Sequence, residues 1–268
     1  MNRVLIDLKA LEENYNIIAG WMKKHGASWA VVTKALCGHA KTLDALYGFG
    51  TRTIADSRLD NLSAMRRIHP DVETWYLRLP HLSIIEDIVK LADVSINSEI
   101  SVIRALGKEA VRQGKIHRIV IMLEMGDLRE GILPGSLVHF YETTLNIPGI
   151  EIVGLGGQFG CINGVVPSID QMAQILIYKE LLELKFSRTI PLVSAGSSIL
   201  LPLLREGSLQ KGINHFRIGD SLFLGTDLIS GAFIDGLRND VVTLEGEIAE
   251  IKEKSLVPPA ETSSASPF

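Results

Sequence analysis

A lysine at the end of an apolar strand is the first residue in this sequence whose type and position suggest chemistry. In the stretch VVTKALCGHA, residues 31–40, the residues before Lys34 are apolar and two are β-branched, while small residues and a glycine follow it. Lysine is rarely placed in such a setting unless its amine is paired or chemically employed. The simpler interpretation is a strand-end lysine that extends its amine into solvent.

Two glycine- and serine-rich turns near the C-terminal end of the chain suggest an anion site. The segments SAGSS (194–198) and RIGD (217–220) each follow an apolar run. Backbone N–H groups in such turns can hold a phosphate, and each turn taken alone is equally consistent with a simple helix cap. A strand-end lysine opposite a phosphate cradle predicts pyridoxal 5'-phosphate, bound covalently through the Lys34 amine. Arg217 would then face the pyridine nitrogen and, being permanently charged, would keep it unprotonated, which suits a racemase; the alternative for Arg217 is a structural ion pair.

The elements that must position these residues alternate regularly along the chain. Eight apolar, β-rich runs are separated by segments with helical spacing and helix-ending glycines, for example at Gly48, Gly114 and Gly207. The predicted strands cover residues 29–33, 51–56, 73–78, 93–97, 118–125, 150–156, 190–196 and 214–219. This count predicts an α/β fold, a (β/α)8 TIM-type barrel, over an open doubly wound sheet, because eight units fit into about 200 residues. In such a barrel the functional side chains gather at the C-terminal ends of the strands.

Two segments do not fit the barrel. Residues 2–8 read as a strand ahead of the first helix, and residues 241–252 alternate with period two, as a β-strand does. A Pro/Ser-rich tail follows. We therefore expect a barrel over residues 1–232, whose first strand pairs with a second domain, and the start of a truncated or incomplete C-terminal β domain over 233–268.

Composition narrows the classes of protein. The chain has 268 residues, 46% of them hydrophobic, and a net charge of −4, without a basic patch for nucleic acid. No apolar run is long enough to cross a membrane. Cys37 and Cys161 are too few for a disulfide framework and lack metal-ligand spacing. We expect a cytoplasmic protein that binds neither metal, nucleic acid nor membrane.

The chain resembles the fold-type III pyridoxal-phosphate enzymes, the alanine-racemase-like barrel family, and within it the ornithine racemases and related amino-acid racemases. The resemblance runs over nearly the whole chain. It rests on the blocks NRVLIDLKALEENYN, TKALCGH, ADSRLDNL, SINSEISVIRALGKEAVRQGKIH, GDLREGI, GLGGQFGCINGVVP, SAGSSILLPLL and NHFRIGDSLFLG.

The resemblance implies a role for each matched residue. It makes Lys34 the catalytic lysine that carries the cofactor and Arg217 the partner of the ring nitrogen. The phosphate cradle would comprise Ser197 and the amides of Gly219 and Asp220, with Ser194 contributing. Arg129 in GDLREG would lie near the substrate carboxylate, and Gln158 would lie beside the cofactor ring, where the family has a histidine.

Two departures from the family bear on activity. Cys37 stands where alanine racemases have a tyrosine that helps to bind the phosphate. The family's second base, on the opposite face of the substrate Cα, is a tyrosine of the partner subunit's C-terminal β domain, whereas no tyrosine follows Tyr178 here. We therefore expect a homodimer in its intact form, and expect the 268-residue form to bind the cofactor but to racemise poorly.

The sequence thus predicts a pyridoxal-phosphate-dependent amino-acid racemase, an isomerase, with ornithine or another basic amino acid as the substrate. Asp56 and Asp127 are the candidate partners for a cationic substrate. The alternative is a non-catalytic pyridoxal-phosphate carrier of the same barrel fold. A further alternative is an unrelated phosphate-binding barrel in which Lys34 is structural.

Overall fold

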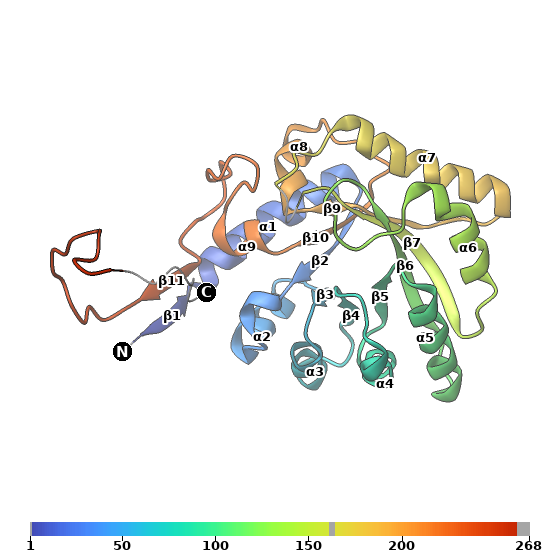
Figure 1. The fold of residues 1–268 in the computed structure, drawn as a ribbon, viewed down its shortest axis with the longest axis horizontal. Helices are drawn as coiled ribbons and strands as arrows, with labels where there is room; N and C mark the ends of the chain where they lie inside the picture. The colour runs from blue at the N-terminus through green and yellow to red at the C-terminus, as the bar shows by residue number, and fades with distance from the viewer. Residues whose placement is uncertain (1, 161–163, 262–268) are drawn as a thin grey trace.

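Parallel strands form a closed barrel at the centre of the molecule (Figure 1). The computed structural model describes residues 2–160 and 164–261, so Cys161 lies outside the described residues. The strands pair in the order β8-β7-β6-β5-β4-β3-β2-β10-β9. They are β2 (Ser28–Val32), β3 (Thr53–Asp56), β4 (Glu73–Tyr76), β5 (Val94–Asn97), β6 (His117–Glu124), β7 (Ile150–Gln158), β8 (Leu192–Ser194), β9 (Gly196–Ser197) and β10 (His215–Ile218).

The ring closes at a bend between β8 and β9. Only Ala195 separates these two strands, and β8 pairs with β7 while β9 pairs with β10, so together they form the seventh of eight barrel strands. A Cβ on Gly196 would lie 2.2 Å from the Phe216 ring. Only glycine therefore allows β9 to approach β10 this closely. The predicted (β/α)8 barrel is confirmed.

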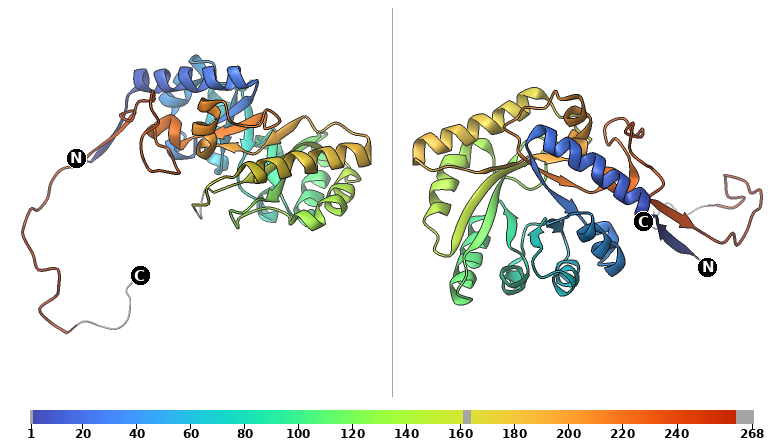
Figure 2. Two further views of the ribbon diagram at one scale, coloured as in Figure 1. Left: turned by 90° about the horizontal axis from the view of Figure 1, so that it is seen from above. Right: turned by 180° about the vertical axis from the view of Figure 1, so that it is seen from behind.

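Helices cover the outside of the barrel (Figures 1 and 2). Short 3-10 turns η1 (Lys34–Leu36), η2 (Leu82–Ile84), η3 (Pro134–Ser136) and η4 (Ser198–Leu200) follow or precede them. The helices are α1 (Leu8–His25), α2 (Ala40–Gly48), α3 (Leu59–Ile68), α4 (Ile85–Leu91), α5 (Ile100–Arg112), α6 (Leu137–Leu145), α7 (Ile169–Phe186), α8 (Leu201–Glu206) and α9 (Asp220–Leu224).

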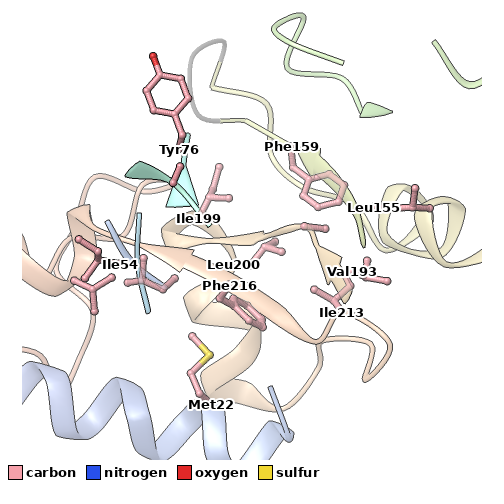
Figure 3. Close-up of a cluster of buried hydrophobic side chains, with 14 of the residues drawn as sticks. Met22, Ile54, Tyr76, Leu155, Phe159, Val193, Ile199, Leu200, Ile213 and Phe216 are labelled. Atoms are coloured by element: carbon pink, nitrogen blue, oxygen red, sulfur yellow. The ribbon is translucent and has the colours of Figure 1, made fainter. Parts of the chain in front are cut away.

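Apolar residues on both faces of the strands produce two buried clusters. One cluster joins strand residues to helix residues and so lies outside the barrel; in Figure 3, Phe216 of β10 lies close to Met22 of α1. The other contains the alternate strand residues and fills the interior: Ala30, Val32, Ala55, Trp75, Val94, Ile96, Val120, Met122 and Val153. Each large side chain buried in this way stabilises the fold by about 1.5–3 kcal/mol. Strands buried on both faces explain why the runs in the sequence are nearly continuous.

Helix α1 connects the two ends of the described chain. Asp7 caps its first turn by accepting from the N–H groups of Lys9 and Ala10. The buried Asn14 amide donates to the carbonyl oxygens of Leu222 and Arg238, at 3.0 and 2.8 Å, and accepts from the Arg238 N–H. One side chain thus fastens α9 and the segment around Arg238 to α1.

A separate two-stranded sheet projects from one side of the barrel (Figures 1 and 2). It pairs β1 (Arg3–Ile6) with β11 (Val242–Glu245) antiparallel. The prediction of a strand over 241–252 is therefore wrong beyond Glu245. Its partner β1 starts at Arg3, opposite Glu245, so the ladder has no further residues to pair.

One of the predicted helix-ending glycines is also wrong. Gly114 and Gly207 have positive φ, as a C-terminal glycine should, but Gly48 is the last residue of α2 and Phe49 follows with ordinary helical backbone angles. The positive φ falls two residues later, at Gly50.

Candidate functional site

Lys34 lies at the C-terminal end of β2, where η1 begins. Its side chain is exposed, whereas Thr33 before it is buried and donates its hydroxyl to the Asp56 carboxylate at 2.8 Å. A cavity of about 130 Å³ lies beside it. Lys34, Gly219 and Asp220 share the lining of this cavity with residues of β1, β11 and α9. The predicted attachment lysine and the predicted phosphate turn therefore face the same space.

The phosphate turn contains a residue that the sequence reasoning missed. The buried Ser198 hydroxyl accepts hydrogen bonds from the N–H groups of Gly219 and Ser221, each at 3.4 Å. Ser197, the serine that was predicted to contribute, pairs with Arg217 in the β9–β10 ladder and is also buried. The signal for Ser198 was present as the second serine of SAGSS. Which of two adjacent hydroxyls reaches a neighbouring turn is set by the η4 backbone, which the residue types do not specify.

Arg217 lies on the inner face of β10 and is only 5% exposed. One guanidinium nitrogen donates to the carbonyl and to the hydroxyl of Ser194, the latter at 2.6 Å, and the other donates to the Gly157 carbonyl at 3.1 Å. The Ser194 hydroxyl also lies 2.8 Å from Nδ1 of His215. Both oxygens of Ser194 are thus directed at its neighbours in the barrel interior.

His215 is held uncharged in this setting. Its ring stacks on Trp75, with 4.3 Å between the ring centroids and 8° between the planes. Burial, with the nearby Arg217 charge as the lesser cause, lowers the pKa of His215 to about 3. The sequence reasoning missed His215 because the ring that it contacts is 140 positions away along the chain.

Arg129 and Gln158 meet at the ends of β6 and β7. The Glu124 carboxylate accepts the N–H groups of Gly126, Leu128 and Arg129 and so ties the loop into a tight turn. Arg129 Nε lies 3.2 Å from a Glu130 carboxylate oxygen, and Gln158 donates to the other oxygen of Glu130 at 3.4 Å. Glu130 thereby links the predicted substrate arginine to the predicted cofactor-ring residue.

The two candidate acids for a cationic substrate are both buried. Asp56 accepts from Thr33, from the Asn61 amide and from the Arg58 N–H, so it fastens β2 to the start of α3. Asp127 lies 3.9 Å from Arg129. Only Asp127 is therefore next to a predicted substrate contact.

The residues present fit a phosphate-bearing aldehyde cofactor. Two amide N–H groups converge on one hydroxyl at 3.4 Å, which is longer than the usual 2.9–3.0 Å, and a phosphate oxygen is a stronger acceptor for such amides. An exposed lysine amine borders the same cavity, and a buried arginine is fixed in the barrel interior. Among the described residues, no helix is long and apolar enough to cross a membrane.

A parallel barrel with a strand-end lysine beside a glycine turn defines the class as a barrel with a cofactor site at the strand ends. Residues 6–227 match the alanine racemase N-terminal domain family. The chain is 34% identical over 257 residues to ornithine racemase of Acetoanaerobium sticklandii, and 32% identical over 256 residues to lysine racemase of Thermotoga maritima. In both cases the match covers 96% of this chain and 72% of the relative. Among solved structures, alanine racemase of Clostridium difficile 630 in complex with cycloserine has a TM-score of 0.73 and 15% identity, covering 94% of this chain and 69% of that one.

This chain belongs to the alanine racemase N-terminal domain family and is a pyridoxal-phosphate-dependent amino-acid racemase.

Proposed function

We propose that this racemase interconverts the L and D forms of an amino acid with a cationic side chain, ornithine or lysine, at the strand ends around Lys34. The observation that carries the proposal is the cavity that Lys34 shares with the Gly219–Asp220 turn. The substrate class is supported by the names of the two relatives and by three carboxylates close to Arg129, those of Glu124, Asp127 and Glu130.

Pyridoxal phosphate, when bound, supplies an electron-withdrawing ring that acidifies the Cα proton of an amino acid joined to it. The chain's own residues would hold the reactants. Lys34 would bind the cofactor aldehyde and then accept or return the Cα proton at its Nζ atom. Ser197, Ser198 and the amides of Gly219 and Asp220 would bind the phosphate.

Arg217 would donate a hydrogen bond to the ring nitrogen. Because a guanidinium cannot give up its proton at ordinary pH, that nitrogen would stay unprotonated and the ring would withdraw electrons less strongly. Such a weakened sink favours prompt reprotonation at Cα, which is racemisation, over side transamination. Arg129 would bind the substrate carboxylate, and Gln158 would lie beside the ring. Ser194, whose oxygens are directed at Arg217 and His215, would contribute through Arg217.

Exchange of the Cα proton tests the proposal directly. The protein with pyridoxal phosphate is incubated in D2O with L-lysine or with L-norleucine, which lacks only the ammonium group; NMR follows the exchange and chiral chromatography follows the D product. We expect at least roughly tenfold higher kcat/KM for lysine, the size of one charge-assisted contact. Equal values would overturn the cationic substrate class, and no exchange with either would overturn racemisation.

A pyridoxal-phosphate carrier without activity is the second candidate. It requires the same cofactor contacts, so the spectrum of the bound cofactor does not separate the two functions. The pairing of β1 with β11 beside the cavity supports the racemase, because Val4, Ile6 and Val242 of this sheet line the cavity next to Lys34. A carrier would bind the cofactor and leave the Cα deuterium content of every amino acid unchanged.

A further inference from the structure

Three side chains from three different strands surround the Arg217 guanidinium and its support inside the barrel. They are Trp75 of β4, Ser194 of β8 and His215 of β10, which we call the arginine clamp. Trp75, Ser194 and His215 are each no more than 3% exposed. None of them borders the cavity beside Lys34. Their contacts are made with one another and with Arg217.

The hydrogen bonds of the clamp run in one direction. A guanidinium can only donate, so the Ser194 hydroxyl accepts from Arg217 at 2.6 Å. The single proton of that hydroxyl is then available for Nδ1 of His215 at 2.8 Å. A hydroxyl that accepts from a cation is polarised and donates more strongly. His215 therefore acts as the acceptor, with its own proton on Nε2.

The surroundings of His215 maintain this direction. Burial and the Arg217 charge keep the ring neutral, since its pKa is lowered to about 3. A protonated ring would have no acceptor for the Ser194 proton and would add a second cation beside Arg217.

Stacking fixes the ring in place. The Trp75 plane lies almost parallel to the His215 ring, and the Trp75 indole N–H donates to Glu73 at 3.0 Å. His215 thus keeps one orientation, and the acceptor that it offers to Ser194 stays at one point. The Ser194 hydroxyl and carbonyl in turn direct one guanidinium nitrogen, while the Gly157 carbonyl directs the other.

We propose that His215, acting through Ser194, is a positioning residue that holds the Arg217 guanidinium where the ring nitrogen of the cofactor is to be bound. The inference rests on the proposed function, in which Arg217 donates to that nitrogen. A role in core packing alone would require only the ring of His215 on Trp75. Acceptor and ring are separable by substitution, so the two roles predict different results.

Two variants separate the acceptor from the ring. His215→Phe keeps an aromatic ring on Trp75 and removes the acceptor, whereas His215→Asn keeps an acceptor near the Nδ1 position and removes the ring. With pyridoxal phosphate bound, we expect His215→Phe to lower kcat/KM about tenfold and to raise the fraction of side transamination, since one buried hydrogen bond to the clamp is lost. His215→Asn should retain most of the activity and the product ratio even if its melting temperature falls. The reverse order of the two variants would overturn the proposal.

A double-variant cycle tests the path through Ser194. Ser194→Ala alone should resemble His215→Phe, and the two together should cost little more than either, because both interrupt one chain of hydrogen bonds. Additive losses would mean that His215 does not act through Ser194.

A measurement without cofactor keeps this inference distinct from the proposed function. Nitrogen-15 NMR of histidine-labelled, cofactor-free protein should show His215 with its proton on Nε2 and without titration between pH 5 and pH 9, and Ser194→Ala should shift the Nδ1 resonance. A proton on Nδ1 would overturn the clamp. If Arg217→Gln leaves racemisation and product ratio unchanged, the role proposed for Arg217 fails; if it impairs both while His215→Phe does not, only the positioning role of His215 fails.

Discussion

At the scale of single residues, the position of Lys34 separates its chemical role from any structural one. Its side chain is exposed and no hydrogen bond of the barrel depends on it, so Lys34→Ala should change the melting temperature by less than about 2 °C. The same change should abolish covalent binding of pyridoxal phosphate, seen as loss of the borohydride-sensitive absorbance band. Lys41→Ala, at another exposed lysine of the adjacent α2, is the control and should keep the band. A band that survives in Lys34→Ala would refute the assignment.

A second buried histidine makes the stability of the barrel depend on pH. His117, 2% exposed at the start of β6, lies 2.8 Å from the Ser95 hydroxyl. Its pKa is lowered to about 4, chiefly by burial and further by Arg118 and Lys115, against the opposing charge of Asp93. Above pH 6.5 both the folded and the unfolded chain keep this histidine neutral. Below pH 6.5 the unfolded chain binds a proton that the folded chain does not bind until about pH 4.

The free energy of unfolding should therefore fall as the pH falls, by up to about 1.4 kcal/mol per pH unit from this group. His117→Gln should remove roughly 2 kcal/mol of the loss between pH 7.5 and pH 5, measured by urea unfolding at each pH. His139→Gln, at an exposed histidine, should leave the pH dependence unchanged. An equal effect of the two substitutions would show that His117 is not held neutral by the fold.

At the scale of elements, two mid-helix glycines with opposite surroundings show how the helices are fitted to the barrel. A Cβ on Gly107 of α5 would lie 2.5 Å from the Pro148 carbonyl and 2.7 Å from Ile147, whereas a Cβ on Gly20 of α1 would meet nothing within 4 Å. Gly107→Ala should lower the free energy of unfolding by about 1–2 kcal/mol, because overpacking outweighs the gain in helix propensity. Gly20→Ala should raise it by about 0.5–1 kcal/mol. The same sign for both substitutions in urea unfolding would contradict the close approach of α5 to residues 147–150.

Elements were predictable from the sequence where local pattern decides them. The apolar runs gave the barrel strands to within a few residues, because strands buried on both faces must be apolar throughout. The length of β11 was not predictable, since it depends on where its partner β1 begins. The clamp was not predictable either: His215 follows the ordinary strand pattern, and its meaning comes from Trp75 across the barrel.

The site was predictable in the same measure. Lys34, Gly219 and Asp220 were located by strand ends and turns, and they share a cavity. Ser194 was predicted at the phosphate, but the direction of its side chain toward Arg217 depends on the closure of the barrel between β8 and β10. The role of each residue toward the cofactor stays a prediction.

At the scale of the whole molecule, the described chain leaves and re-enters the barrel close to one point. Backbone hydrogen bonds join Ile234 to Gly225 and Asp227 to Ala232, so the chain is folded back on itself on both sides of residue 232. Val241 is fully buried and its carbonyl accepts from the Asp7 N–H, directly before β11. We propose that the barrel unit extends to Val241 and that β1 and β11 together begin a second unit, a few residues later than the division at 232.

The small sheet of β1 and β11 should cause the chain to self-associate. Val4 and Leu244 are directly opposed across the two strands and are 60% and 74% exposed. In the described part of the chain each of the two strands pairs only with the other, which leaves an open edge on both. An apolar face with open edges favours contact with a second copy.

Sedimentation equilibrium of the 268-residue chain should show mass rising with concentration, and Leu244→Lys should weaken this association at least roughly tenfold, because a charge at the centre of an apolar contact must be desolvated. Leu184→Lys is the matched control: Leu184 of α7 is 82% exposed but lies away from this sheet, so the substitution should leave the association unchanged. If Leu244→Lys associates as strongly as the unsubstituted chain, copies do not meet through β1 and β11. Weakening by Leu184→Lys instead would place the contact on α7.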